Sequence, residues 1–363
     1  MKTVDRYIIT EFGRIFLLAL VTLMAFYEMV VFLDMVGYFV KFHATSDMVF
    51  RYMLFRAPMA VFHVTPICVL LAALLTMGSM SRYSELVAMK ACGMSMPRIA
   101  APILAVCGLI CLLSFLDSEY LFHISAKESN RIYYEEIKKQ PRKGLFSNEM
   151  VWYKADDGSI WNIGHLDMGK RELRDLSIFS FDPTGSRVVL RATAREGKVT
   201  NGSWTLNGYS ERRFLPGGGF EEKHWETYTS PANMITLGDL DKVQLDPEEM
   251  NLIQIREYIR EIKSKGYDYT RHVVDMHAKV AFPLISIVMP LIAIPLGVRS
   301  SRAGGALVGI GVAVVTGALF WFSFSMAVAF GQAGRIPPEL AAYGSHIVFA
   351  AAGFAMLLRS ERG

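Results

Sequence analysis

Residues 81–98 read SRYSELVAMKACGMSMPR and lie between two long apolar segments of the chain. Ser81 can cap a helix, Glu85 would place a negative charge in its first turn, and Gly93 can end it in the left-handed conformation. Apolar side chains recur here at roughly helical spacing, at Leu86, Met89 and Cys92. The pattern predicts a short helix at a membrane surface, which either docks a partner or only returns the chain to the bilayer.

The composition around this stretch is that of an integral membrane protein. The chain has 363 residues, 52% of them hydrophobic, and gathers them in long blocks where a soluble protein would spread them in stripes. A helix needs roughly 20 apolar residues to cross a hydrocarbon core of about 30 Å. Six blocks can serve as spans, at residues 15–35, 52–80, 99–122, 280–298, 306–330 and 340–358. The net charge of +4 is too small to indicate nucleic-acid binding.

The middle of the chain, residues 125–271, is polar and alternates like β structure. Residues 150–166 predict two strands about a DDGS turn, and residues 197–206 predict two strands about Asn201–Gly202. Residues 173–194 predict another pair, so the segment is expected to form a β-sandwich or a jelly-roll-like domain. The domain is expected to close with an amphipathic helix that starts at Asp246–Pro247, ends near Gly266, and carries an apolar side made of Ile255, Ile259 and Ile262.

The basic residues decide which side of the membrane each part faces. With six spans, both termini and residues 81–98 lie on one side, together with Lys2, Arg6, Arg14, Arg82, Lys90, Arg98, Arg299, Arg302, Arg359 and Arg362. The opposite short loops hold only Lys41, Arg51, Arg56 and Arg335. The positive-inside rule therefore places the termini in the cytoplasm and the β domain outside. The sequence predicts an α-helical integral membrane protein with six transmembrane helices (3 + 3) at residues 1–124 and 272–363, and an inserted β-jelly-roll-like domain at residues 125–271.

The sequence contains no motif that indicates catalysis. It lacks a phosphate-binding loop of the GxxxxGK[ST] type and an HExxH metal motif, and no clustered Cys/His set has metal-ligand spacing. Glu28 is a costly charge inside a span, at about 2.5–3.5 kcal/mol on insertion scales, so it should face a partner or a cavity. Near the external ends of the first three spans, a lipid headgroup could be held by Lys41, Arg51, Arg56 and Arg131. Each of these basic residues could equally meet only solvent and lipid.

The order of several short segments resembles one known family, the lipopolysaccharide export permeases LptF and LptG. The resemblance covers essentially the whole chain. It rests on DRYI at 5–8, MGSMSRYSELVAMKACGMS at 77–95, LDP at 245–247, KGYDYTRH at 265–272 with VDMHAKVAFPLIS at 274–286, and IPP at 336–338. The β-domain text and the approach to the fourth span resemble the LptG branch more than the LptF branch.

This resemblance implies a function that the residues alone do not. Such permeases pair as an LptF–LptG heterodimer on two copies of the cytoplasmic ATPase LptB, which alone binds ATP and Mg, so this chain would need no cofactor. The pair takes lipopolysaccharide from the outer leaflet of the inner membrane. The periplasmic β-jelly-roll domain then passes it towards LptC and LptA. Residues 81–98 would be the coupling helix that contacts the ATPase, with Glu85 matching the acidic residue that pairs with an arginine, beside Ser84, Leu86, Met89 and Gly93.

The chain departs from the family pattern in the first span. Some LptG proteins carry a lysine that contacts substrate phosphates just before the aspartate matched here by Asp34. This chain has Val31 at that position, and its first lysine after it is Lys41. The phosphate-binding role would then fall to Lys41, Arg51, Arg56 or Arg131, in a substrate site that also includes Glu28 and Asp34.

Two alternative functions remain open at this point. A membrane-anchored receptor or scaffold could use the external β domain to bind a partner without transport, but it leaves the short helix and the six spans unexplained. An intramembrane enzyme could use Glu28 or His63, but the sequence offers no nucleophile and base at workable spacing. A transporter half without its own ATPase should be found beside a separate nucleotide-binding chain, and a scaffold should not.

Overall fold

A computed structural model gives the fold of this chain. It describes residues 3–139, 151–154, 158–167, 172–182, 187–200, 203–215, 217–230, 250–264, 268–303 and 306–360. The chain divides into two compact units. The helical unit comprises Met1–Tyr133, Pro247–Ile259 and Asp268–Gly363, and the β unit comprises Tyr134–Asp246 and Arg260–Tyr267. The first boundary lies later than the expected residue 124, because the helix of the third span continues beyond the membrane-length segment and packs on α2.

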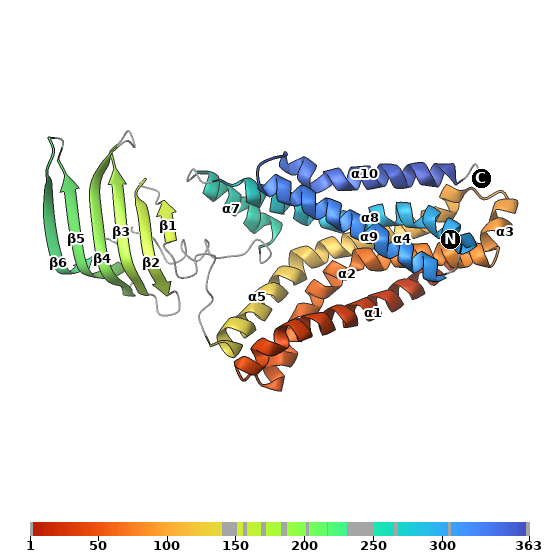
Figure 1. Cartoon of the computed structure of the whole chain (residues 1–363), viewed down its shortest axis with the longest axis horizontal. Helices are drawn as coiled ribbons and strands as arrows, with labels where there is room; N and C mark the ends of the chain where they lie inside the picture. Colours follow the sequence, from red (N-terminus) through yellow and green to blue (C-terminus); the bar gives the residue numbers. More distant parts are fainter. Residues whose placement is uncertain are drawn as a thin grey trace. The chain divides into compact units, whose positions relative to one another are not determined.

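Six helices of the described chain are long and apolar enough to cross a membrane, which confirms the six predicted spans (Figure 1). They are α1 (Thr3–Lys41), α2 (Ser46–Arg82), α4 (Met96–Leu116), α8 (Thr270–Ala303), α9 (Ala306–Gln332) and α10 (Pro338–Arg359). The third span continues as the π-helical η1 (Asp117–Phe122), α5 (His123–Arg131) and the π-helical η2 (Ile132–Ile137). Pro58 and Pro66 lie inside α2 without ending it.

The core of the helical unit lies where α2 packs against α8. Phe62 of α2 stacks on Phe282 of α8, with ring centroids 4.5 Å apart. Further along the same pair, a Cβ atom placed on Gly297 would lie 2.5 Å from the backbone oxygen of Leu74. The two helix backbones therefore approach closely, as they do where small residues line a helix pair. By contrast, the apolar middle of α1 is exposed in the isolated chain.

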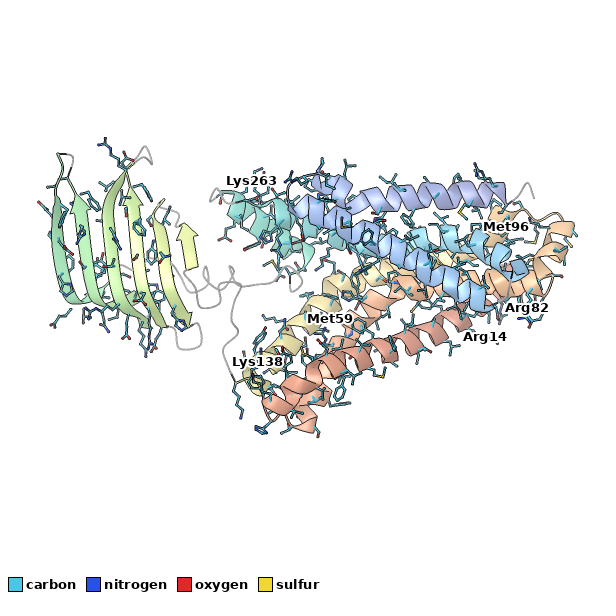
Figure 2. The ribbon with its side chains drawn as sticks, in the orientation of Figure 1. Arg14, Met59, Arg82, Met96, Lys138 and Lys263 are labelled. Carbon is cyan, nitrogen blue, oxygen red and sulfur yellow. The ribbon has the colours of Figure 1, made fainter. Side chains whose placement is uncertain are left out.

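The short helix in residues 81–98 is smaller than the sequence predicted. It is α3 (Glu85–Ala91), because α2 continues through Arg82 and α4 already begins at Met96 (Figure 2). The prediction of Ser81 as its cap is wrong: the Ser81 hydroxyl donates to the backbone oxygen of Val298 at 3.3 Å, so it ties α2 to α8. Ser84 precedes α3 with φ +60° and reverses the chain there. The predicted stop is confirmed, since Gly93 has φ +81°.

The described strands form one antiparallel sheet in chain order, β1 to β6. They are β1 (Val151–Lys154), β2 (Ile160–Asp167), β3 (Glu172–Phe181), β4 (Val188–Thr200), β5 (Ser203–Phe214) and β6 (Phe220–Thr229). The three predicted strand pairs are confirmed, as is an inserted antiparallel β domain. The order is that of a meander and not the Greek-key order of a jelly roll, because each strand pairs with its neighbour in sequence.

Strands β3 to β6 share a break in the alternation of their side chains at one level, which we call the crease. On β3, Leu173 and Leu176 are both buried while the two residues between them are exposed, although strict alternation would place these leucines on opposite faces. The neighbouring strands repeat this at the same level, with Arg195–Glu196 on β4 and Glu226–Thr227 on β6 exposed, and with the exposed Asn207 and half-exposed Gly208 on β5. The strands stay in register through this level, so the break in alternation is shared by all four strands and is not a β-bulge of one of them.

The amphipathic helix is confirmed as α7 (Leu252–Ser264), with the predicted apolar side of Ile255, Ile259 and Ile262 buried or half-buried. The start signal Asp246–Pro247 lies outside the described residues. Instead, α7 begins with a capping box: the Asn251 side chain accepts from the Gln254 N–H at 2.8 Å, and the Gln254 side chain accepts from the Asn251 N–H at 2.9 Å.

Candidate functional sites at the two ends of the helical unit

The chain termini and α3 lie at one end of the helical unit, which we call the terminal end (Figure 1). Here Leu86 anchors α3, since it is only 3% exposed, and the partly buried Met89 packs against the same core. Val87 points outward and is 58% exposed. Ser84 and Gly93 flank the helix and are exposed. The helix thus has one side fixed in the unit and another side free to contact a different chain.

Glu85 lies at the start of α3 with its carboxylate held by a second helix. The Tyr7 hydroxyl of α1 donates to the Glu85 carboxylate, at 3.1 Å from one oxygen and 3.0 Å from the other. Glu85 remains half-exposed. A carboxylate offers about four acceptor positions, so this one can still receive an arginine.

Three further contacts tie residues 81–98, which we call the α3 region, to other spans. Arg98 Nη2 lies 2.8 Å from the Asp5 carboxylate, in an ion pair whose Asp5 side chain is 15% exposed. Lys90 Nζ donates to the backbone oxygen of Ser360, after α10, at 3.0 Å. Together with the Ser81 contact to Val298, these bonds connect the α3 region to α1, α8 and α10. On α3 itself, Glu85 bonds α1 and Lys90 bonds the residue after α10.

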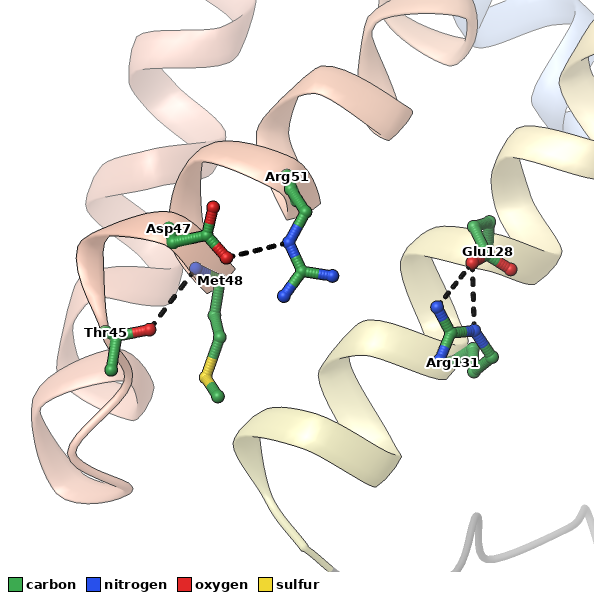
Figure 3. A network of polar contacts seen from close by, with 6 residues as sticks. All are labelled: Thr45, Asp47, Met48, Arg51, Glu128 and Arg131. Carbon is green, nitrogen blue, oxygen red and sulfur yellow. Dashed lines mark hydrogen bonds and ion pairs between the residues drawn. The ribbon is translucent and has the colours of Figure 1, made fainter.

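The opposite end of the helical unit carries the predicted basic residues, but two of them already have acidic partners (Figure 3). Arg51 on α2 bonds Asp47 at 2.9 Å, and Arg131 on α5 bonds Glu128 at 2.5 Å. The two pairs lie on neighbouring helices that pack together. Each pair joins residues of the same helix and is at least one-third exposed at both members, so it contributes only about 0.3–0.5 kcal/mol.

The remaining predicted substrate residues are spread along α1 and α2. Arg56 donates to the Tyr52 hydroxyl at 3.2 Å, and its Nε is buried without a hydrogen-bond partner in the described chain. Both carboxylate oxygens of Glu28 are likewise buried without a described hydrogen-bond partner. Asp34 and Lys41 are exposed, Lys41 with its Nζ 5.6 Å from the centre of the Phe42 ring. The structure therefore places Arg51 and Arg131 on neighbouring helices but gathers no single cluster of all six residues.

Sequence reasoning missed two sets of contacts. Tyr7 and Asp5 were not assigned to the α3 region, although the DRYI segment that contains them was noticed. In addition, the Glu119 carboxylate of η1 accepts from the Leu252 N–H of α7 at 3.1 and 3.2 Å, and Lys279 of α8 donates to the Met250 backbone oxygen. Nothing in the local pattern could have indicated this second set, because its partners are far apart in sequence.

Comparison with known proteins gives a consistent result. The family profile of the lipopolysaccharide export system permeases LptF/LptG matches residues 6–359. The chain is 28% identical over 286 residues to the lipopolysaccharide export system permease protein LptG of Escherichia coli K12, which covers 75% of this chain and 74% of the relative. It is 23% identical over 266 residues to LptG of Haemophilus influenzae, covering 71% of this chain and 70% of the relative. These names agree with the expected LptG branch.

The match extends through all six candidate spans and the inserted sheet, in the same chain order that the structure shows. A profile that covers nearly the whole chain accounts for its membrane helices and its β unit together. This chain therefore belongs to the lipopolysaccharide export permease family LptF/LptG.

Proposed function

We propose that this chain is the LptG-type half of a transporter that extracts lipopolysaccharide from the bacterial inner membrane, driven by ATP hydrolysis on a partner subunit. The observation that carries the proposal is α3, an anchored helix that presents Glu85 and an apolar surface in a chain that has no nucleotide-binding motif. In this scheme an LptF-type chain completes the permease and two LptB subunits bind ATP and Mg. The chain itself carries no catalytic residue and contacts no nucleic acid.

The terminal end is the proposed ATPase-binding surface. Leu86 and Met89 hold the helix in place, Ser84 and Gly93 set the turns at its two ends, and Glu85 receives an arginine of the ATPase. A charge pair at a partly covered interface contributes more than an exposed pair, because less water screens it. This assignment places the termini in the cytoplasm and the β domain in the periplasm, in agreement with the distribution of basic residues.

The opposite end is the proposed site for the lipid phosphates. Arg51 and Arg131 are the best-supported ligands, since their acidic partners lie on the same helix at least one-third exposed and cost little to displace, and guanidinium groups bind phosphate oxygens in pairs. Lys41 and Arg56 would add positive charge along α1 and α2. Glu28 and Asp34 would then be counter-charges that limit how strongly the lipid is held.

The β unit is the proposed route onward. Its core gathers Trp161, Trp204, Leu206 and Tyr209, and acyl chains would reach this apolar cluster only when the domain opens. In this role it would pass the lipid to LptC and then to LptA. A receptor or scaffold that only binds a periplasmic protein is the competing function, and it predicts no ATPase partner.

Gentle detergent purification of the tagged chain from its own membranes tests the proposal. Mass spectrometry should identify an ATPase subunit, a second six-span permease and lipopolysaccharide in the same complex. Recovery of the chain alone, or with a periplasmic protein and no ATPase, would favour the scaffold function.

The same purification with Glu85→Ala tests the coupling role. The variant should keep its fold but transport less lipid per complex, while the control Glu221→Ala, at an exposed position on β6, should behave as the unmodified chain. Wild-type assembly and transport by Glu85→Ala would remove Glu85 from the ATPase interface.

A further inference from the structure

The DRYI segment at residues 5–8 contacts both ends of the α3 region. Its tyrosine, Tyr7, bonds Glu85 at the start of α3, and its aspartate, Asp5, pairs with Arg98 just after the start of α4. The two contacts span 78 and 93 residues of sequence. The first turns of α1 therefore contact the chain at the start of α3 and again just beyond its end.

The position of Tyr7 is fixed by its neighbours on α1. Ile8 and Phe12 are fully buried one helical turn apart, and Asp5 lies on the same side one turn earlier. Tyr7 is adjacent to this buried side and directs its hydroxyl to α3, while the residue stays 46% exposed. Because the first turns of α1 cannot rotate without unburying Ile8 and Phe12, the Tyr7 oxygen is held at a set place.

We infer that Tyr7 is a positioning residue for Glu85, which orients the carboxylate for its cationic partner and transmits movement of α3 to the first span. The inference rests on the proposed ATPase-binding role of Glu85. A glutamate on the surface of a short helix has many rotamers, and fixing one of them lowers the entropic cost of forming an ion pair. The Tyr7 hydroxyl supplies one proton, so oxygen lone pairs remain for a bidentate arginine.

The Asp5–Arg98 ion pair gives the same segment a second point of attachment. It is more enclosed than the pairs at the opposite end of the unit, because Arg98 is 39% and Asp5 15% exposed. With Tyr7 bonded to the start of α3 and Asp5 bonded to α4 just beyond its end, a displacement of α3 either moves the start of α1 or breaks the Tyr7–Glu85 bond. By contrast, Lys90 reaches α10 only through a backbone oxygen, so α1 is the span with the direct side-chain link to Glu85.

A double-mutant cycle in the purified complex tests the inference. The variants are Tyr7→Phe, Glu85→Gln and the pair together, measured for assembly, ATP hydrolysis and lipopolysaccharide transport. Tyr7→Phe keeps the ring and removes only the hydroxyl. We expect normal assembly with about threefold to tenfold less transport per ATP hydrolysed, and no further loss when Tyr7→Phe is added to Glu85→Gln.

The control is Thr10→Val on the same helix. It removes a hydroxyl that donates to the Arg6 backbone oxygen at 2.8 Å. It should leave the transport-to-ATP ratio unchanged. Losses that add in the double variant, or a Tyr7→Phe complex with the wild-type ratio, would overturn the inference. If Glu85→Gln itself transports normally, the proposed ATPase contact fails first.

A charge exchange provides a second test if Tyr7→Phe reduces assembly. Asp5→Arg and Arg98→Asp should each lower the transport-to-ATP ratio, and the two together should restore it at least in part. No recovery in the double variant would show that the link between α1 and the α3 region does not carry the coupling.

Discussion

Replacing Gly297 by alanine should loosen the contact between α2 and α8. The added Cβ would lie 2.5 Å from the Leu74 backbone oxygen and 3.1 Å from the Met77 Cβ, and a backbone oxygen has no flexible group that could move aside. The helices must then separate by roughly 1 Å, at an overpacking cost of about 1–3 kcal/mol. This exceeds the gain of about 0.8–1 kcal/mol that alanine offers over glycine within a helix.

Gly78 provides a matched control at the same contact. A Cβ there would meet the Gly297 backbone oxygen at 3.5 Å, which is ordinary van der Waals contact. Gly78→Ala should thus keep or raise the stability of the complex in detergent, whereas Gly297→Ala should lower its apparent melting temperature by a few degrees, at about 2–4 °C per kcal/mol. If Gly297→Ala melts at or above Gly78→Ala, the close approach of the two helices is not as described.

Three other outcomes are expected. Arg131→Gln should reduce the lipopolysaccharide that co-purifies with the complex about threefold to tenfold, while Arg174→Gln on the outer face of the sheet should not; equal losses would remove the proposed phosphate site. Gly208→Val should destabilise the β unit by about 1–3 kcal/mol in urea unfolding, because φ at Gly208 is +64°. The control Gly217→Ala should be neutral. Equal stability of the two variants would contradict the crease geometry. Burial raises the pKa of Tyr209 from 10.0 to about 12, so the folded sheet keeps this proton to a higher pH than the unfolded chain does. The stability of the β unit should therefore fall as the pH rises from 10 to 12. A Tyr209→Phe variant with the same pH dependence would refute this.

The six spans could be predicted because the length of an apolar helix is dictated by the bilayer and needs no tertiary information. The strand pairs about Asn201–Gly202 and the DDGS turn could be predicted for a similar reason, since a tight turn fixes which strands pair. In contrast, Ser81 has the side chain of a helix cap but lies inside α2 and bonds Val298 of α8. Tertiary packing decided its role, and the local pattern could not reveal that.

The candidate-site residues likewise divide into those that local sequence signals predict and those that only tertiary packing reveals. Glu85 and Gly93 could be placed from short-range signals, and the structure puts Glu85 in the first turn of α3 and Gly93 just after its end, as expected. The Tyr7–Glu85 bond joins residues 78 apart in sequence, so only the folded arrangement of α1 and α3 reveals it. The acidic partners of Arg51 and Arg131 were within four residues in sequence, and i,i+3 and i,i+4 spacing could have predicted both.

The crease in the sheet constrains how this domain can change in length. Each of strands β3 to β6 carries its extra outward residue at the same level, so neighbouring strands stay in step on both sides of it. Deleting Asp175 alone would place Leu173 and Leu176 two residues apart, where strict alternation keeps both on the apolar face, but β3 would then fall one residue out of step with β2 and β4 on one side of the crease. A shortened strand is therefore tolerated only when its neighbours shorten with it, which makes the crease a property of the whole sheet and not of any single residue.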